Sequence, residues 1–376
     1  MGKIKVVPLV DQVTLVLQPT ENTPITNWNE HAQSLIEIFM KKSKLEEVFG
    51  FEEKGRLFEG YNSGMTTFNA PFYTCIAYHD TVKNMGIVVH FSGWSFHRFQ
   101  EKTGWKLYDL FQNSADEAYS IRLSRLDNAI DIIDSNIDVD ELYKTIISKE
   151  TGVQFSNGRT NASKLKPYIE ENLDVASFYV GSLKRSNSVL RVYDKKREMI
   201  QTNGHLKDHY NQFDTVIRFE QKLKGKLAHQ ASERIHTIKS DKELNNFVLS
   251  SVTNKYRFFD TQTKNYRLET SLLLDALDET NFTFSPMVSR ANSLEATRDY
   301  LINNSGLLTY FHKINAIYGP ETVKEGLGDF YEQFKNSKPN ESVGKWLSKY
   351  QKIYEEQGIK PWEHLMVNIK ENNHEE

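Results

Sequence analysis

Cysteine is nearly absent from this sequence, and long apolar runs are absent from it. Cys75 is the one cysteine among 376 residues, so the chain cannot form an internal disulfide and suits a reducing compartment, which we expect to be the cytoplasm. No stretch approaches the roughly 18 consecutive apolar residues that a membrane-spanning helix needs. The first 18 residues are interrupted by Pro8 and Asp11, a pattern that argues against a signal peptide. We therefore expect a protein with no membrane partner.

A strong excess of charge of one sign is also missing from the chain as a whole. Its net charge is −3 at pH 7, with 26% charged and 39% apolar residues, which is typical of a globular protein with hydrophobic cores. The charge is uneven, however. Residues 184–234 contain 12 Lys and Arg against 6 Asp and Glu, a local charge of +6 that leaves −9 for the rest of the chain. Such a segment indicates polyanion binding, although a solvated surface would have the same composition.

Apolar periodicity predicts a strand-rich first part and a helical second part. Strand-like alternation marks residues 4–18, 56–79, 85–92, 120–133, 177–198 and 215–223, with a hairpin turn at Asn69-Ala70-Pro71, and helical spacing marks 28–49, 138–150, 230–250, 268–278, 292–316, 321–335 and 342–357. Residues 157–172 and 199–213 are polar and are expected to be connections. We predict an α+β fold, with a curved, mainly antiparallel sheet and helices on one of its faces in residues 1–245. A mostly helical region, 246–376, would follow.

Three of the predicted strands carry reactive side chains on their polar faces. Side chains alternate along a strand, so Asp127 shares a face with Arg125, Ala129 and Asp131, Tyr193 shares one with Arg191 and Lys195, and Glu220 shares one with Arg218. The opposite faces are apolar and would point into the core. We therefore expect the polar faces to lie together on the open side of the sheet.

These side chains are suited to metal-assisted phosphoryl transfer. Asp127 and Glu220 are hard-oxygen ligands of the kind that Mg²⁺ or Mn²⁺ prefers, and such an ion polarises a phosphodiester. The hydroxyl of Tyr193, flanked by cations, could attack phosphorus and form a covalent phosphotyrosine that keeps the bond energy for rejoining. Asp131 lies roughly 13 Å along the strand from Asp127, so both could bind one ion only across a bulge.

A simpler interpretation of the same residues is structural. Asp127 and Glu220 could form ion pairs with Arg125, Arg218 or Lys222 on an exposed sheet face. Tyr193 could be a surface tyrosine in an ordinary hairpin. Spacing alone does not separate this interpretation from the catalytic one.

Three motifs occur in the order and spacing of a known family. They are Arg125-Leu126-Asp127-Asn128-Ala129-Ile130-Asp131, then Tyr179-Val180-Gly181-Ser182 with Arg191-Val192-Tyr193-Asp194-Lys195-Lys196-Arg197-Glu198, and then Arg218-Phe219-Glu220. In these motifs the chain resembles the replication initiation factor family, which contains initiators of rolling-circle plasmids and relaxases of integrative conjugative elements. The resemblance extends over roughly residues 5–230. Lys222 departs from it, because some relatives have a second glutamate at that position.

The resemblance implies a DNA-nicking enzyme with Tyr193 as its nucleophile. One strand would be cut at an origin, with the 5′ phosphate held on the tyrosine, and a divalent ion, Mg²⁺ or Mn²⁺, would be required. Asp127 and Glu220 would be metal ligands, with Asp131 as a further candidate. DNA contacts are assigned first to Arg191 and Lys195, and then to Lys196, Arg185, Arg125 and Arg218. Tyr179 is a competing tyrosine, but it lacks flanking cations on its own face.

Two other functions fit the sequence. A relaxase for conjugative transfer would use the same chemistry, whereas a non-catalytic origin-binding protein could use the basic segment together with residues 246–376, for origin recognition or partner binding. The expected partner is origin DNA, single-stranded or extruded as a hairpin at the nick site. A host helicase and a second copy of the chain are further candidates.

HUH relaxases, another class of DNA-nicking enzyme, hold their metal with two histidines one residue apart. None of the 11 histidines here forms such a pair, which disfavours this class.

Overall fold

The chain forms two compact units. The structure is a computed structural model that describes residues 4–20, 27–53, 57–69, 72–154, 165–169, 175–184, 186–278, 283–284, 294–303, 306–339, 343–344, 347, 351 and 355. The units are Met1–Val288 and Ser289–Glu376. The first unit ends later than the boundary predicted at 245, because helix α9 (Asp241–Thr253) buries Phe247 and Val248 in the core beneath the sheet.

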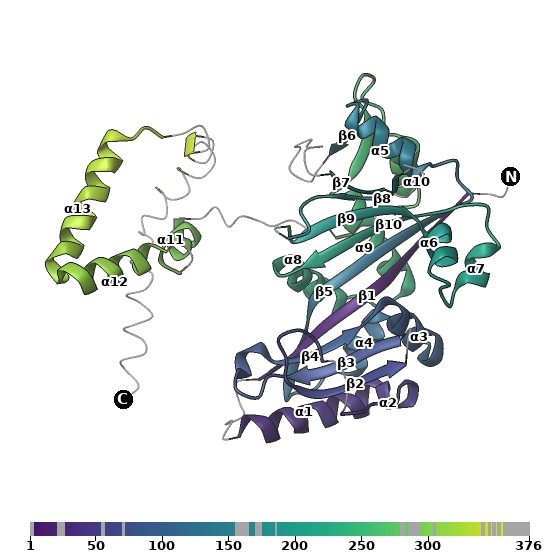
Figure 1. Ribbon diagram of the computed structural model, residues 1–376, viewed down its shortest axis with the longest axis horizontal. Helices are drawn as coiled ribbons and strands as arrows, with labels where there is room; N and C mark the ends of the chain where they lie inside the picture. Colours follow the sequence, from purple (N-terminus) through teal and green to yellow (C-terminus); the bar gives the residue numbers. More distant parts are fainter. Residues whose placement is uncertain are drawn as a thin grey trace. The chain divides into compact units, whose positions relative to one another are not determined.

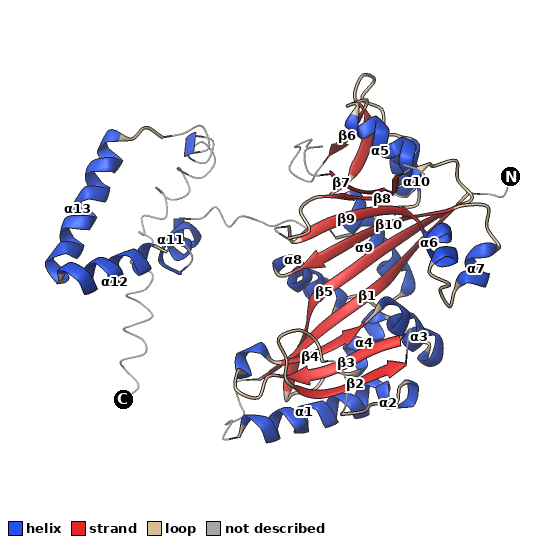
Figure 2. Ribbon diagram, in the orientation of Figure 1, coloured by secondary structure: helices blue, strands red, loops and turns tan. Residues whose placement is uncertain are grey.

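A nine-stranded antiparallel sheet forms the body of the first unit (Figures 1 and 2). In spatial order its strands are β2 (Ser63–Asn69), β3 (Phe72–Tyr78), β4 (Ile87–Phe91), β1 (Lys5–Pro19), β5 (Tyr119–Ile133), β10 (Val216–Lys224), β9 (Ser188–Asp194), β8 (Val175–Val180) and β7 (Leu165–Ile169). The predicted α+β class with a mainly antiparallel sheet is therefore confirmed. The hairpin predicted at 56–79 forms between β2 and β3, and its turn residues Ala70 and Pro71 lie outside the described residues.

Helices cover the apolar face of the central strands. The helices of this unit are α1 (Trp28–Ser43), α2 (Leu45–Val48), η1 (Lys83–Met85), α3 (Gly93–Thr103), α4 (Leu107–Asn113), α5 (Val139–Ile147), α6 (Lys195–Gln201), α7 (Lys207–Asn211), α8 (Lys226–Ile235), α9 and α10 (Leu268–Asp275). Helices α8 and α9 pack against β5 (Figure 1). Leu126, Ile130 and Phe219 are fully buried in the resulting core. Their neighbours in the sequence, which include Asp127 and Glu220, consequently project from the opposite face.

Local structure differs from the sequence prediction at several points. Lys195, predicted to lie in a strand, begins α6, because the Asp194 side chain accepts a hydrogen bond of 2.9 Å from the backbone N–H of Arg197 and caps the helix. The two polar segments predicted as connections contain β7 and α7. The helix predicted at 28–49 divides at Lys44, whose φ of 58° is left-handed. A small second sheet pairs β6 (Thr151–Gln154) with β11 (Arg257–Asp260).

The second unit is helical where it is described, as predicted for the end of the chain. Its helices are α11 (Leu294–Asn303), α12 (Leu307–Tyr318) and α13 (Pro320–Asn336), and α12 contacts α13. The helix predicted at 342–357 lies mostly outside the described residues. None of the described helices of either unit combines the length and the apolar character needed to cross a membrane.

Candidate active site

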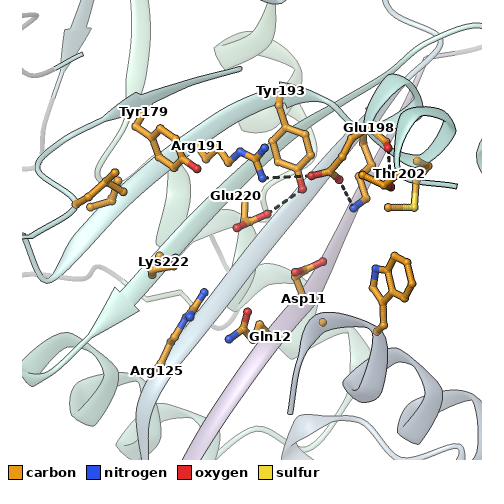
Figure 3. A pocket seen from close by; sticks show the side chains of 16 residues that line it. Asp11, Gln12, Arg125, Tyr179, Arg191, Tyr193, Glu198, Thr202, Glu220 and Lys222 are labelled. Atoms are coloured by element: carbon orange, nitrogen blue, oxygen red, sulfur yellow. Dashed lines mark hydrogen bonds and ion pairs between the residues drawn. The ribbon is translucent and has the colours of Figure 1, made fainter. Parts of the chain in front are cut away.

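A polar cavity of about 370 Å³ lies on the face of the sheet from which Tyr193 and Glu220 project (Figure 3). Strands β1, β5, β8, β9 and β10 line it together with α3 and α6. Its polar lining consists of Asp11, Gln12, Arg125, Tyr179, Arg191, Tyr193, Lys195, Glu198, Thr202, Glu220 and Lys222. The fold thus gathers one predicted nucleophile, one predicted metal ligand and several predicted DNA contacts in one cavity.

Tyr193 and Glu220 are in direct contact inside this cavity. In the β9–β10 pair Tyr193 stands opposite Arg218 and Glu220 stands opposite Arg191, so the tyrosine and the glutamate are diagonal neighbours on one face. Tyr193 Oη donates a hydrogen bond of 2.9 Å to Glu220 Oε2 (Figure 3). Burial, and then the charge of Glu220, raise the pKa of Tyr193 well above 10. The phenol is therefore protonated at neutral pH and can lose its proton only to a nearby base.

Glu220 has the protonation behaviour of such a base. Burial raises the pKa of Glu220 to about 7, and the negative charges of Asp11 and Asp127 add to this effect. A general base transfers protons most efficiently when its pKa lies near the working pH. In the described part of the chain Glu220 forms no ion pair with a Lys or Arg. Its pairing with Arg218 or Lys222, the structural alternative drawn from the sequence, is therefore not present.

Asp11 is a site residue that the sequence did not single out. The pairing of β1 with β5 shifts its register between Val10 and Gln12, so Asp11 is the extra residue of a β-bulge. As a result the side chains of Asp11 and Gln12 both line the cavity (Figure 3). A Cβ at Gly93 would come within 2.9 Å of Asp11 Oδ2, so α3 begins directly against this carboxylate. The available signal was a single acid within a largely apolar strand.

Asp127 lies near the cavity but is paired. Arg125 Nε donates a hydrogen bond of 2.9 Å to Asp127 Oδ1, and Arg125 Nη2 bonds the other carboxylate oxygen. Asp127 is 1% exposed, and Arg125, not Asp127, lines the cavity. For this acid the ion pair with Arg125 anticipated as the structural alternative is confirmed. Asp127 still acts on the site through its charge, because it raises the pKa of Glu220.

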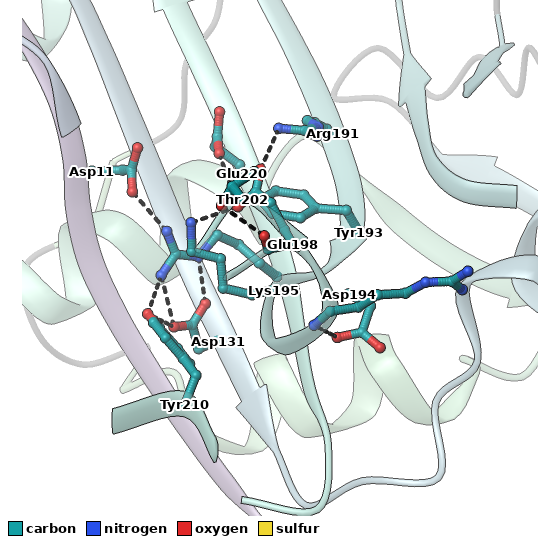
Figure 4. Close-up of polar contacts among 12 residues, drawn as sticks. Asp11, Asp131, Arg191, Tyr193, Asp194, Lys195, Glu198, Thr202, Tyr210 and Glu220 are labelled. Atoms are coloured by element: carbon teal, nitrogen blue, oxygen red, sulfur yellow. Dashed lines mark hydrogen bonds and ion pairs between the residues drawn. The ribbon is translucent and has the colours of Figure 1, made fainter. Parts of the chain in front are cut away.

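Asp131 and Arg218 form a buried cluster next to this cavity, and Figure 4 shows Asp131 beside Tyr210. Arg218 Nε and Nη2 donate hydrogen bonds of 2.6 and 2.8 Å to the two oxygens of Asp131, and Nη1 donates one of 2.6 Å to Asp11 Oδ1. Tyr210 Oη accepts from Arg218 Nη2 at 2.8 Å. Asp131 lines a neighbouring cavity and does not reach Tyr193. Since two carboxylates neutralise Arg218, which is 2% exposed, this arginine joins strands and is not presented to DNA.

Arg191 and Lys195 surround the tyrosine and share one carboxylate. The guanidinium of Arg191 lies 4.0 Å from the centre of the Tyr193 ring and 5.8 Å from that of Tyr179. Arg191 Nη1 is 3.3 Å from Glu198 Oε1, and Lys195 Nζ is 2.7 Å from Glu198 Oε2 (Figure 4). In the absence of a substrate anion, Glu198 therefore provides the negative charge that these two cations bind.

The remaining predicted DNA contacts are less closely tied to the site. Lys196 Nζ donates a hydrogen bond of 2.6 Å to the backbone oxygen of Phe213, which fixes the segment around α7. Arg185 lies outside the described residues. Lys222, which is not among the predicted DNA contacts, lines the cavity, and burial lowers its pKa. Tyr179, the competing tyrosine, also lines the cavity, but no described carboxylate accepts a hydrogen bond from it.

Among the described acids, Asp11 and Glu220 are the two that we consider placed to share a cation in this cavity. Asp11 and Glu220 line it together with Glu198, whose two oxygens pair with Arg191 and Lys195. Arg125 bonds both oxygens of Asp127 and Arg218 bonds both oxygens of Asp131, whereas Arg218 bonds one oxygen of Asp11. Within the described ranges no group of three or more His, Cys, Asp or Glu side chains is arranged to hold a metal ion. Two carboxylates are still a donor set that Mg²⁺ accepts, because this ion usually keeps several waters and binds substrate phosphates.

Comparisons with known proteins support the motif-based resemblance. A sequence model of the replication initiation factor family matches residues 121–316, which is more than half of the chain. Among solved structures, the rolling circle replication initiator protein from Geobacillus stearothermophilus is similar in fold, with a TM-score of 0.51 and 21% sequence identity over 72% of this chain and 97% of that chain. No curated protein matches the chain significantly. The matched segment contains the strand of Asp127, the hairpin of Tyr193 and the strand of Glu220, and the chain belongs to the replication initiation factor family.

Proposed function

We propose that this protein nicks and rejoins one strand of origin DNA and thereby initiates rolling-circle replication of a plasmid or mobile element. Tyr193 is the nucleophile, and it holds the 5′ phosphate of the cut strand. The observation that carries the proposal is the 2.9 Å hydrogen bond from Tyr193 to Glu220 inside a cavity lined by cations. Family membership and the fold of the similar initiator support the same function.

Glu220 acts as the general base in this proposal. The phenolic proton already points at Glu220 Oε2, so it can transfer as Tyr193 Oη approaches phosphorus. The Oη–phosphorus bond forms, the bond from phosphorus to the 3′ oxygen breaks, and the 3′ oxygen takes up a proton from water. Rejoining is the reverse reaction, in which the 3′ hydroxyl attacks the phosphotyrosine and the tyrosine recovers its proton.

Arg191 and Lys195 bind the scissile phosphate in this scheme. Both lie within 6 Å of the Tyr193 ring, at 4.0 and 5.7 Å from its centre. The phosphate would replace the carboxylate of Glu198, to which both cations are now bonded. Arg125 and Lys222 line the same cavity, so the strand would meet positive charge on either side of the tyrosine.

Asp11 and Glu220 are the residues that would hold a divalent cation. Their fit rests on the raised pKa of Glu220, which reflects burial first and then the negative charges of Asp11 and Asp127, with Arg218 opposing the shift. When bound, Mg²⁺ or Mn²⁺ polarises the phosphodiester and offsets the charge that develops on its oxygens. Asp127 becomes a further ligand only when Arg125 turns away from it.

The test is a nicking assay on supercoiled plasmid that carries the gene and its flanking DNA. With Mg²⁺ the protein should relax the plasmid and leave a covalent protein–DNA adduct, and mass spectrometry should locate the nucleotide on the peptide of Tyr193. Tyr193→Phe should bind DNA without forming the adduct, whereas Tyr179→Phe should still form it. A shift of the DNA without relaxation by the native protein would instead support a non-catalytic origin-binding protein.

A further inference from the structure

A second cavity lies beside the one that contains Tyr193. Its volume is about 660 Å³, within the roughly 300–1,000 Å³ of small-ligand sites. Asp11, Gly93, Trp94, Lys195 and Met199 line both cavities. The two spaces therefore share one wall, and the chemistry proposed for the tyrosine makes no use of the second.

Aromatic rings form one side of the second cavity. The ring of His205 lies 4.6 Å from that of Trp94 and 5.9 Å from that of His97, measured between centroids. Tyr210 and Phe213 line the same cavity from α7 and the segment after it. Burial lowers the pKa of His97 and of His205. Both imidazoles are consequently neutral at pH 7 and present uncharged ring faces.

Close packing fixes this aromatic side. A Cβ at Gly204 would come within 2.6 Å of Met199 Sδ and 3.3 Å of Trp94 Cζ2. A side chain at position 204 would displace the end of Met199 and press on Trp94, so the glycine lets the segment that carries His205 lie close to α6 and α3. Rings held in this way lose little conformational entropy when a planar ligand stacks against them.

Hydrogen-bonding groups lie elsewhere in the lining. Arg218, Asp131 and Tyr210 form the buried cluster described above, and Gln100 and Lys106 also line the cavity. A cavity of this composition suits a flat, largely apolar ligand with polar groups at its edge. A nucleobase has this chemistry.

The histidines of this cavity do not indicate a metal site. His97, His205 and His209 line it together with Glu101. In the part of the chain that the structure describes, however, no three His, Cys, Asp or Glu side chains have an arrangement that could hold a metal ion. The ring contacts of His205 with Trp94 and His97 fit a stacking surface better.

We propose that the second cavity receives an unstacked nucleobase of the cleaved strand, next to the scissile phosphate. Single-stranded DNA is bound by stacking its bases on aromatic side chains, and enzymes that act on DNA can draw a nucleotide out of the stack into a pocket. Lys195 lies on the wall shared by the two cavities, beside Tyr193. A base held against Trp94 and His205 would fix the position of the adjoining phosphate. This inference rests on the proposed function.

The test compares two oligonucleotides of equal charge. One is oligothymidine of about 12 nucleotides, and the other is an abasic strand of the same length, so the difference in affinity reports base contacts and not phosphate contacts. The full-length protein should prefer oligothymidine in fluorescence anisotropy titrations. Trp94→Ala and His205→Ala should each reduce this preference about tenfold, whereas Trp94→Phe, which keeps an aromatic face, should retain most of it. Tyr266→Ala, at an exposed aromatic residue on another part of the first unit, is the matched control and should retain all of it.

Each outcome bears on the inference. Circular dichroism checks that the alanine variants are folded. If Trp94→Ala is not folded, His205→Ala carries the test, because it should lose the same preference. Equal affinity of the native protein for the two strands would overturn the inference, as would a preference that Trp94→Ala and His205→Ala leave unchanged. If either result occurred while the Tyr193 adduct still formed on plasmid DNA, the base site would be wrong and the nicking function would stand. If the native protein preferred oligothymidine but formed no Tyr193 adduct on plasmid DNA, the result would contradict the nicking function instead.

Discussion

Arg218 Nη1 donates a hydrogen bond of 2.6 Å to Asp11 Oδ1, although the two residues are 207 positions apart in the chain. The same guanidinium binds both oxygens of Asp131. Because β5 lies between β1 and β10, this arginine joins three strands on the polar face of the sheet. It also fixes the carboxylate that β1 contributes to the proposed cation site.

Loss of the Arg218 side chain should destabilise the fold. Arg218→Met leaves Asp131, which is 4% exposed, without its cation, and breaking a buried ion pair in this way costs about 3–5 kcal/mol. The free energy of unfolding in urea measures the effect. Lys242→Met removes the cation of an exposed pair with Asp278 and should cost less than about 1 kcal/mol. Similar losses for the two variants would show that the buried cluster contributes little.

Removal of Asp11 should weaken binding of the divalent cation. Asp11→Asn takes away one of the two carboxylates proposed to hold the cation, so affinity for Mn²⁺ should fall by at least about tenfold. Calorimetric titration of the protein without DNA measures this directly. Asp116→Asn, which removes a surface carboxylate paired with Lys42, should have no effect. If Asp127→Asn weakened Mn²⁺ binding as much as Asp11→Asn, Asp127 would be a ligand despite its pair with Arg125.

Neutralising Glu198 should strengthen DNA binding. Glu198→Gln releases Arg191 and Lys195 from their ion pairs, so both become available to phosphate. The slope of log K against log salt concentration should become steeper by about 1 to 2. Asp116→Asn changes the net charge equally and is the matched control. An equal gain in affinity for the two variants would mean that only total charge matters.

Stability should fall at mildly acidic pH because of His90. Burial, and then the charge of Arg125, lower the pKa of His90 from 6.5 to about 4, while Thr14 Oγ1 lies 2.9 Å from its Nδ1. Below pH 6.5 the unfolded chain binds this proton and the folded chain does not, so the stabilisation is complete above pH 6.5 and is lost as the pH falls toward 4.

A variant without the imidazole measures this effect. Between pH 7 and 5 the native protein should lose about 2 kcal/mol more of its free energy of unfolding than His90→Gln. Urea unfolding at the two pH values gives both quantities, and each protein is compared with itself, so a lower starting stability of the variant does not matter. Equal pH dependence of the two proteins would contradict the prediction.

The sequence by itself determined the strands that carry the site. Alternation in β5, β9 and β10 assigned Asp127, Tyr193 and Glu220 to one face, because side-chain direction repeats every two residues whatever the neighbouring strands are. The order of the three motifs indicated the family that the comparisons support. The contact between Tyr193 and Glu220 needs, in addition, the pairing of β9 with β10 in this register, which alternation within each strand does not contain.

Only the tertiary structure decided which acids are available. Asp127 and Asp131 share the polar face with Glu220, but an arginine bonds both oxygens of each of them, whereas Arg218 bonds one oxygen of Asp11. The pair of Asp131 with Arg218, two residues 87 positions apart in the chain, depends on the register of β5 with β10. Asp11 enters the cavity through a bulge in the pairing of β1 with β5. Register and bulges arise from contacts between distant segments, and a periodic pattern within one segment does not contain them.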